Sequence, residues 1–388
     1  MSRSGWLLVA LGVAGCGEPP IVGVDAAVDA AGADAAPDAA PPRDDDRALV
    51  ATSDGTAGAL VSLDLPSQTL ATAVLPALAT AQPALRRLGR TVYLADRTGD
   101  QITVIDGPSQ THPPPIALPA GSHPVDVARL GDRLYVVAED GVGLLVIDLV
   151  LGGPPVALDL GALDPDDGLP NCTSAYAVGG NVFVVCAVLD DGAPGRPPRG
   201  VAKVAIVDGD DDSLAGMLDL PWSSPVGQLQ PTPLDSHYVG DLVIGLAPSE
   251  DDLSTGCLAR IGVDATPTTG CVIDNEDLLG VARRVEMAPG GGLLWIAVTA
   301  REDGVGRGSV RGFDVDSATV WDGSLSPASQ EIVDLAVCPS GDLVVADVGA
   351  TEPGLRVYSG GTTLELTTAA VALDGPLGPR AGIACTRR

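Results

Sequence analysis

The densest group of potential metal ligands in the sequence is a run of carboxylates, Asp208-Gly209-Asp210-Asp211-Asp212, with Asp219 eleven residues beyond the first. Carboxylate oxygens are the ligands that calcium prefers, so calcium is the one cofactor that this segment could hold. However, a helix–loop–helix calcium site needs glycine where Ser213 stands, and the flanking residues have the pattern of strands. The segment therefore favours a turn in which aspartates bond to their own backbone.

Three histidines, His112, His123 and His237, are the candidates for acid–base chemistry. Each stands beside Pro or Ser in an expected turn, and none has an Asp or Ser partner at a known motif spacing. The glycines of residues 304–308 are similar to a phosphate-binding loop, but the segment leads into a strand at Ser309 to Asp314 rather than into a helix N-terminus, so we interpret it as a flexible turn. No Gly-x-Ser-x-Gly elbow occurs. The sequence thus identifies no catalytic residue and no metal site.

Composition excludes several classes of protein. The 388 residues carry 22 Lys and Arg against 51 Asp and Glu, a net charge of -29, which repels phosphate backbones and excludes a nucleic-acid partner. Lys203 is the single lysine, so neither a P-loop nor a basic membrane-binding helix can form. With 49 Gly and 33 Pro, the chain is interrupted too often for long helices and suits many short strands. We therefore expect an all-β globular protein.

A repeat carries the fold prediction. Its first marker is an apolar pair ending in Asp, and its second is a glycine just before a β-branched or aromatic run, as in Gly89 before Val92-Tyr93-Leu94. The first marker recurs at roughly 40 to 60 residues, at Asp64, Asp106, Asp148, Asp208, Asp264 and Asp316, with Ser359 in a seventh copy. Further apolar segments bring each unit to four short strands. Seven such units predict a seven-bladed β-propeller of antiparallel blades, with a β-solenoid or two stacked sandwiches as alternatives.

One unit also carries a family resemblance. Val92-Tyr93-Leu94-Ala95, followed by Val104-Ile105-Asp106 and Gly121-Ser122-His123-Pro124, resembles the consensus of YVTN-family propeller repeats. The resemblance is strong in this unit and the next, weaker in the fourth and fifth, and extends loosely over residues 47 to 388. The domain opens on a second-strand pattern at residues 48–51 and ends on a first-strand pattern at residues 381–384. We therefore expect the C-terminal strand to complete the first blade and close the ring.

The N-terminus predicts export and lipidation. Residues 1–15 contain Arg3 and an apolar run too short to span a bilayer, which is typical of a signal peptide. Val13-Ala14-Gly15-Cys16 resembles the lipobox of bacterial lipoproteins, which implies a lipid anchor on Cys16, and Gly17 rather than Asp after it implies the outer membrane. An ordinary signal peptide is the alternative. Residues 16–46, rich in Ala, Asp and Pro, predict an extended disordered tether.

Six cysteines remain if Cys16 carries lipid, an even number in an oxidising compartment. Cys172 and Cys186 flank a glycine turn, and Cys257 and Cys271 flank the Asp264 turn, so each pair is expected to bridge two strands of one blade. Cys338 and Cys385 end equivalent first strands of blades seven and one, where a disulfide would clamp the closure. A zinc site is the alternative, but no closely spaced cysteine pair or neighbouring histidine supports it.

Two surfaces could bind a ligand. On the face that carries the loops between second and third strands, long loops predict an acidic rim suited to a cationic or calcium-bridged envelope partner, and the first strands predict charged groups at the channel mouth. The rim residues are Asp190, Asp191, Glu250, Asp251, Asp252, Glu302 and Asp303, and the channel-mouth residues are Asp126, Arg284 and Asp334.

These features favour a monomeric cell-envelope lipoprotein whose propeller binds or scaffolds a protein, polysaccharide or envelope component without catalysis. The alternative is a hydrolase of the lactonase type, because YVTN-like and lactonase propellers are similar in pattern. Fold alone does not establish a reaction, and the channel offers few groups for one.

Overall fold

The computed structural model describes residues 46–53, 58–78, 83–233, 240–264, 266–302, 305–321, 331–349, 353–359, 365–366, 371 and 382–387. The chain divides into two compact units, Met1–Pro37 and Asp38–Arg388, and all described residues belong to the second. The predicted signal peptide, Cys16 and the tether up to residue 45 lie outside the described residues, as do His237 and Asp303.

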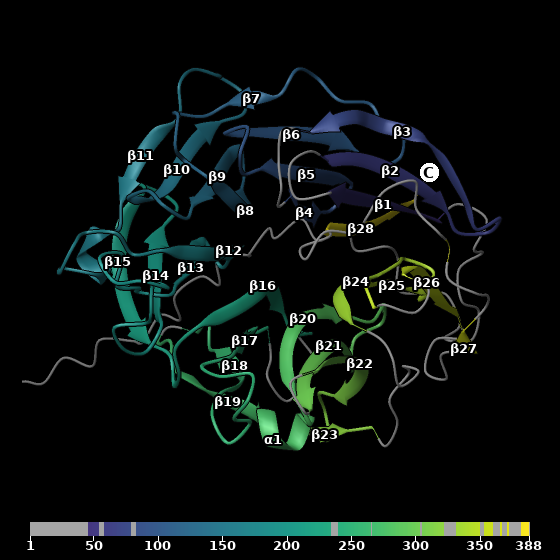
Figure 1. Cartoon of the computed structure of the whole chain (residues 1–388). Coiled ribbons are helices and arrows are strands. Elements are labelled where there is room, and N and C mark those ends of the chain that lie inside the picture. Colours follow the sequence, from purple (N-terminus) through teal and green to yellow (C-terminus); the bar gives the residue numbers. More distant parts are fainter. Residues whose placement is uncertain are drawn as a thin grey trace, which may run out of the picture. The chain divides into compact units, whose positions relative to one another are not determined.

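Seven four-stranded antiparallel sheets form a ring of blades, which confirms the predicted seven-bladed β-propeller (Figure 1). Blade 1 contains β28 (Gly382–Arg387), β1 (Asp46–Ser53), β2 (Gly58–Asp64) and β3 (Thr69–Leu78), and blade 2 contains β4 (Pro83–Leu88), β5 (Thr91–Asp96), β6 (Gln101–Asp106) and β7 (Ile116–Ala117). Blade 3 contains β8 (Pro124–Leu130), β9 (Arg133–Ala138), β10 (Gly143–Asp148) and β11 (Val156–Asp159), and blade 4 contains β12 (Cys172–Val178), β13 (Asn181–Cys186), β14 (Lys203–Asp208) and β15 (Ser213–Asp219). Blade 5 contains β16 (Pro225–Pro231), β17 (Leu242–Leu246), β18 (Cys257–Ile261) and β19 (Thr269–Asp274), and blade 6 contains β20 (Val281–Met287), β21 (Leu293–Glu302), β22 (Val305–Asp314) and β23 (Thr319–Val320). Blade 7 contains β24 (Ile332–Val337), β25 (Leu343–Asp347), β26 (Gly354–Ser359) and β27 (Glu365–Leu366).

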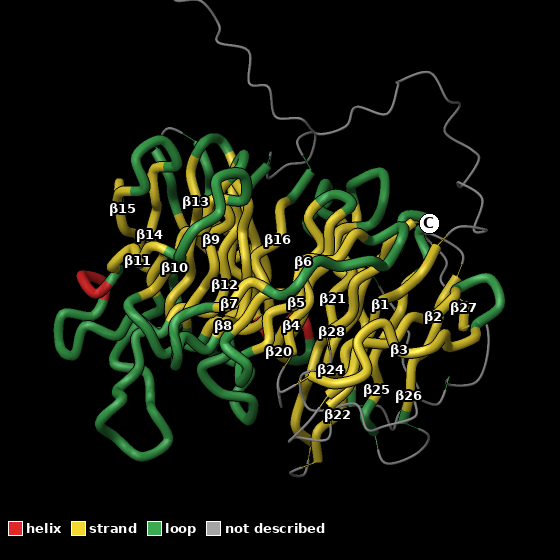
Figure 2. Tube along the Cα trace, turned by 90° about the horizontal axis from the view of Figure 1, so that it is seen from above, coloured by secondary structure: helices red, strands yellow, loops and turns green. Residues whose placement is uncertain are grey.

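The strands run between the two faces of the ring, and turns and loops join them on those faces (Figure 2). Among the described residues, a 3₁₀ turn at Gly161–Leu163 and helix α1 (Asn275–Leu278) lie in connections between strands. The first strand of each blade lies nearest the axis, and the fourth lies at the outer edge (Figure 1). First strands from all seven blades therefore surround one central channel.

Burial follows strand position within the blade. Second strands such as β17 and β25 are buried along their whole length, because neighbouring blades cover both of their faces. The outer strand β15 instead alternates between exposed and half-buried residues, as expected where one face meets solvent. This explains why the second strands appear in the sequence as continuous apolar runs rather than as alternating patterns.

The hydrophobic core is divided among the blade interfaces. One cluster joins Tyr135 and Val137 of blade 3 to Val182 and Val184 of blade 4. Equivalent clusters lie at the other six interfaces of the described ring. Each blade is therefore stabilised mainly by its two neighbours, and closure of the ring supplies the last interface.

The repeated aspartates form the predicted turns. Asp106 accepts a hydrogen bond from the Ser109 amide at 3.1 Å, and Asp148 accepts two, from Val150 at 2.9 Å and Leu151 at 2.7 Å. In the sixth unit the aspartate that ends the third strand is Asp314, which accepts the Ser317 amide at 2.9 Å. The sequence marker at Asp316 was therefore two residues late in that blade.

Blade 6 differs from the prediction in one further way. Its second and third strands, β21 and β22, are each ten residues long and are joined after only two residues. Val305 and the residues up to Gly308 pair with β21, so this part of the segment predicted to be a flexible turn belongs to a strand. The second-to-third connection of blade 6 is thus only two residues long and is not an expanded loop.

All three predicted disulfides are present. Cys172–Cys186 joins the first two strands of blade 4, where these residues are register partners. Cys257–Cys271 joins the third and fourth strands of blade 5. Cys338–Cys385 joins blade 7 to blade 1 and so crosses the closure of the ring.

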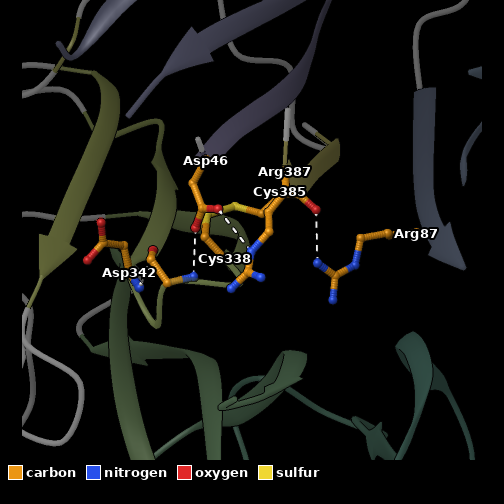
Figure 3. The surroundings of a disulfide bond; sticks show 7 residues. Asp46, Arg87, Cys338, Asp342, Cys385 and Arg387 are labelled. Carbon is orange, nitrogen blue, oxygen red and sulfur yellow. Dashed lines mark hydrogen bonds and ion pairs between the residues drawn. A yellow bond between two sulfur atoms is a disulfide. The ribbon is translucent and has the colours of Figure 1, made fainter. Parts of the chain in front are cut away.

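The closure is reinforced by polar contacts around that disulfide (Figure 3). The C-terminal strand β28 pairs with β1 and completes blade 1, as predicted. The buried carboxylate of Asp46 accepts the Ser340 amide at 2.6 Å and lies 3.8 Å from Arg387 Nε. Arg87 of blade 2 donates to the Cys385 carbonyl at 3.0 Å. Blades 7, 1 and 2 are therefore linked where the two ends of the ring meet.

Candidate functional site

Five of the seven innermost strands contain a β-bulge near their first residues. The bulges lie in β8, β12, β16, β20 and β24, where the register with the second strand shifts. A bulge adds an unpaired residue and redirects the side chains beside it. In β20 this places Arg283 and Arg284, which would point to opposite faces of a regular strand, on the wall of the same cavity.

In β8, β12, β20 and β24 the first residue after the bulge is polar, and in β16 the polar residue Gln228 lies within the irregular stretch. These side chains meet at one level of the channel. Together with Arg86 of β4 and Glu286 of β20, they form what we call the axial belt. The belt consists of Arg86, Asp126, Ser174, Gln228, Arg284, Glu286 and Asp334. All but Glu286 are buried. The belt includes all three predicted channel-mouth residues, Asp126, Arg284 and Asp334, so the structure does bring these together.

Asp126 and Arg86 form the centre of the belt. Arg86 Nη2 donates to Asp126 Oδ2 at 2.9 Å, and Ser174 Oγ donates to the same oxygen at 2.6 Å. Arg86 Nη1 reaches the Leu229 carbonyl at 2.8 Å, and Gln228 Nε2 reaches the Leu85 carbonyl at 3.2 Å. These contacts join blades 2 and 5, which face each other across the ring (Figure 1). Protein side chains therefore occupy the axis at this level.

The belt also ties blades 3, 4 and 7 each to the following blade by a recurring contact. Asp126 accepts the Ala175 amide at 3.2 Å, Ser174 accepts the Leu229 amide at 2.8 Å, and Asp334 accepts the Ile383 amide at 2.8 Å. In each case the donor belongs to the innermost strand of the following blade. These contacts satisfy backbone groups that would otherwise be buried without a partner, so the belt has a structural role.

Burial and neighbouring charges have opposing effects on the pKa values of Arg284 and Asp334 in the belt. Arg284 donates to Gln228 Oε1 and to Glu286 Oε1, the latter at 2.6 Å, and its Nε lies 3.4 Å from Asp334 Oδ1. Burial raises the pKa of Asp334 to about 6, although Arg284 and the Ile383 amide act to lower it. Burial opposes the charge on Arg284, but Glu286, Asp334 and Asp126 outweigh it and raise the pKa of Arg284.

Above the belt, the channel widens into a cavity of about 540 Å³, which we call the funnel. Its floor includes Gln228, Arg284 and Asp334. Its walls include the first residues of innermost strands, such as Pro83 and Pro225. The volume lies in the range of small-molecule binding pockets. All seven blades contribute to the funnel, which opens on the face that carries the loops between second and third strands.

Two groups of ion pairs lie at the funnel mouth. On the blade 6 side, Glu250 pairs through Oε1 with Arg283 Nη2 and through Oε2 with Arg301 Nε, the latter at 3.3 Å. We call these three residues the clasp, and all three line the funnel. On the blade 3 side, Glu139 also lines the funnel and pairs with Arg97 at 2.8 Å.

Next to Glu139, Asp140 contacts three cationic or titratable side chains. It lies 2.6 Å from His123 Nδ1, 3.0 Å from Arg196 and 3.4 Å from Arg97. Burial acts to raise the pKa of Asp140, but the His123 hydrogen bond and the charges of Arg196 and Arg97 outweigh it and lower the pKa. The sequence showed no partner for His123, because Asp140 lies 17 residues away on another connection.

The predicted acidic rim divides into paired and exposed residues. Asp190 pairs with Arg199 at 3.1 Å, Asp191 pairs with Arg196 at 2.5 Å, and Glu250 belongs to the clasp. Asp251 is exposed and lies 4.0 Å from Arg301, and Asp252 is exposed and accepts the Ser254 amide. Glu302 ends β21, and Asp303 lies outside the described residues. Of the rim residues whose side chains are described, Glu250 is the one that lines the funnel.

The candidate calcium segment forms turns, as the sequence favoured. Asp208 accepts the Asp210 amide at 2.8 Å, Asp211 accepts the Ser213 amide at 3.1 Å, and Asp212 pairs with Arg133 at 2.9 Å. Within the described part of the chain, no group of three His, Cys, Asp or Glu side chains is placed to hold a metal ion.

Sequence reasoning missed four belt residues, Arg86, Ser174, Gln228 and Glu286. Ser174 and Gln228 occupy the same repeat position as Asp126, Arg284 and Asp334, so alignment of the units on polar residues would have found them. Arg86 could not have been found in this way, because β4 contains no bulge. The role of Arg86 depends on its contact with Leu229 across the axis.

The sequence matches no family model and no curated protein. Solved structures share its fold. A protein from Lactobacillus plantarum is 16% identical over 88% of this chain and 99% of that chain, with a TM-score of 0.57. The β-propeller domain of Cps50 (Swd1) from Myceliophteria thermophila is 11% identical over 80% of this chain and 93% of that chain, with a TM-score of 0.55. A quinonprotein alcohol dehydrogenase-like protein from Bacteroides thetaiotaomicron is 10% identical over 82% of this chain and 74% of that chain, with a TM-score of 0.54. Identities this low show the fold alone.

Three disulfides are typical of proteins that fold outside the cytoplasm. Among the described residues, no helix has the length and apolar character needed to cross a membrane.

Proposed function

We propose that this protein is a cell-envelope lipoprotein, anchored through Cys16 in the outer membrane, whose propeller of YVTN-like repeats binds a ligand or partner at the funnel without catalysis. The observation that carries the proposal is the funnel itself, a cavity to which all seven blades contribute and which lies at the mouth of a channel blocked by the axial belt. A rigid cavity surrounded by loops is a common place for binding.

The chemistry of the funnel floor supports binding over turnover. Asp334, Arg284 and Gln228 are engaged with one another or with backbone groups of neighbouring blades. Groups held this way are well positioned to orient a ligand, but a general base or nucleophile must exchange its proton with the substrate during turnover. At the rim, Asp251 and Asp252 are the exposed carboxylates that a cationic or calcium-bridged partner would contact.

The binding role can be tested by blocking the funnel. Thr173 lies on the bulge of β12 and lines the funnel, so Thr173→Trp should fill part of it. Ser213→Trp, at an exposed position on the outer strand of blade 4, is the matched control. Both variants, expressed with their native signal, would be used to capture components from envelope fractions, with circular dichroism to verify folding.

Capture by the native protein and by Ser213→Trp, but not by Thr173→Trp, is the expected result. Equal capture by all three would exclude the funnel. The same proteins would be incubated with a panel of lactones, and turnover that Thr173→Trp abolishes would favour the hydrolase alternative instead. Lipidation is tested separately, because Cys16→Ser should move the protein out of the membrane fraction.

A further inference from the structure

The clasp at the funnel mouth has the geometry of an anion-binding site that the protein fills with its own carboxylate. Glu250 comes from the connection between β17 and β18, whereas Arg283 and Arg301 come from β20 and β21 of the next blade. Each guanidinium contacts a different oxygen of the single carboxylate. Planar guanidinium groups match carboxylate and phosphate oxygens in this way, with stronger hydrogen bonds than neutral pairs make.

The clasp is accessible and continuous with the funnel. Side-chain exposure is 29% for both Arg283 and Glu250 and 49% for Arg301, so solvent reaches all three. Below them, Arg284 also lines the funnel, with its side chain 9% exposed and paired with Glu286 and Asp334. Blade 6 therefore presents three guanidinium groups to the cavity, in a protein with only 22 Lys and Arg residues.

We propose that the funnel takes a small organic ligand that carries a carboxylate, and that this group binds Arg283 and Arg301 in place of the Glu250 side chain. The inference rests on the proposed binding role of the funnel. Glu250 then acts as an internal competitor, and a ligand binds only the fraction of molecules in which the clasp is open. The apparent affinity of the ligand is therefore its intrinsic affinity multiplied by that fraction. Displacement of Glu250 requires a change only in the connection that carries it, because this connection lies outside β17 and β18.

This arrangement predicts that substitutions of Glu250 and of Arg301 change the affinity for a carboxylate ligand in opposite directions. Glu250→Gln keeps the size of the side chain but removes the competing charge, so it should tighten binding of a carboxylate by about tenfold. Arg301→Gln removes one of the two guanidinium groups and should abolish that binding. A clasp that only stabilises the fold would instead give weaker or unchanged binding in both variants.

The probe is radiolabelled succinate, measured by equilibrium dialysis against the full mature chain, with succinamide as an uncharged competitor of the same length. We expect weak binding to the native protein, tighter binding to Glu250→Gln, none to Arg301→Gln, and no competition by succinamide. Thermal unfolding of each variant verifies folding, and the half-exposed position of Arg301 keeps its substitution tolerable.

Absence of succinate binding to folded Glu250→Gln, or equal competition by succinamide, would overturn the inference. The two proposals fail separately. Envelope capture that Thr173→Trp abolishes, without succinate binding to Glu250→Gln, would leave the funnel as a binding site for another chemistry. Succinate binding without envelope capture would leave the clasp as an anion site and remove the proposed envelope partner.

Discussion

At the scale of single residues, Asp334 shows how burial and charge compete in the axial belt. Its carboxylate faces Arg284 and accepts two backbone amides, those of Leu335 at 2.9 Å and Ile383 at 2.8 Å. Desolvation is nevertheless the larger effect and raises its pKa to about 6. The folded protein therefore holds a proton on Asp334 at pH values where the unfolded chain has released it.

This shift predicts a specific pH dependence of stability. Because the folded pKa is raised, the stabilisation linked to Asp334 is fully present below the unfolded pKa of 3.8 and is lost as pH rises through about 6. The difference corresponds to about 3 kcal/mol. Asp334→Asn should remove this loss, so the free energy of unfolding of the native protein should fall relative to that of the variant between about pH 4 and about pH 7.

The measurement is chemical unfolding of both proteins across that range. Asp314→Asn is the control, because hydrogen bonds from Ser317 and Asp316 lower the pKa of Asp314 and give the opposite sign. The stabilisation of the fold that is linked to Asp314 is lost as pH falls. Parallel pH profiles for the native protein and Asp334→Asn would show that Asp334 titrates normally in the folded state.

At the scale of the strand, the bulges and the polar residues beside them together fix the position of one blade relative to the next. The bulge turns these side chains along the channel wall, and in β8, β12 and β24 the side chain then accepts an amide from the next innermost strand. Neighbouring blades are otherwise held mainly by side-chain packing, which does not fix the position of one strand along another. The contacts of Asp126, Ser174 and Asp334 fix that position.

Ser174→Ala tests this role of the polar residues. The substitution leaves the buried Leu229 amide without its acceptor, which should reduce the free energy of unfolding by about 1–3 kcal/mol. Ser62→Ala is the matched control. Ser62 is equally buried, but its partner is the half-buried side chain of Gln110, which can turn to water, so its loss should cost about 1 kcal/mol or less. Equal losses from urea unfolding of the two variants would argue against a special role for the contact between blades.

At the scale of the whole molecule, stability depends on closing the ring. Each blade has a core interface on both sides, and the one between blades 7 and 1 depends on a C-terminal strand placed beside an N-terminal one. Opening at this interface exposes two blade faces at once. The Cys338–Cys385 disulfide and the Asp46 contacts oppose that opening (Figure 3).

Removing this disulfide should therefore open the ring locally before it unfolds globally. Cys338→Ala with Cys385→Ala releases a link across 47 residues, worth about 4 kcal/mol by loop entropy. Hydrogen exchange should accelerate first in β28 and β1, with blade 4 still protected. The matched pair Cys172→Ala with Cys186→Ala, which spans 14 residues within one blade, should accelerate exchange in that blade alone. Uniform acceleration in the first variant would contradict a role in closure.

The sequence by itself determined the parts of this protein that depend on local pattern and repetition. Recurring aspartate and glycine turns at a constant position in each unit fixed the number of blades, and the same register fixed the three disulfides, because equivalent cysteines must fall at equivalent strand ends. The channel position of Asp126, Arg284 and Asp334 also followed from the register. Only the tertiary structure decided which charges neutralise one another. Arg86 reaches blade 5 across the axis, and Glu250 lies between two arginines of the next blade. These contacts depend on distances between blades rather than on spacing along the chain, and electrostatic interactions depend on those distances.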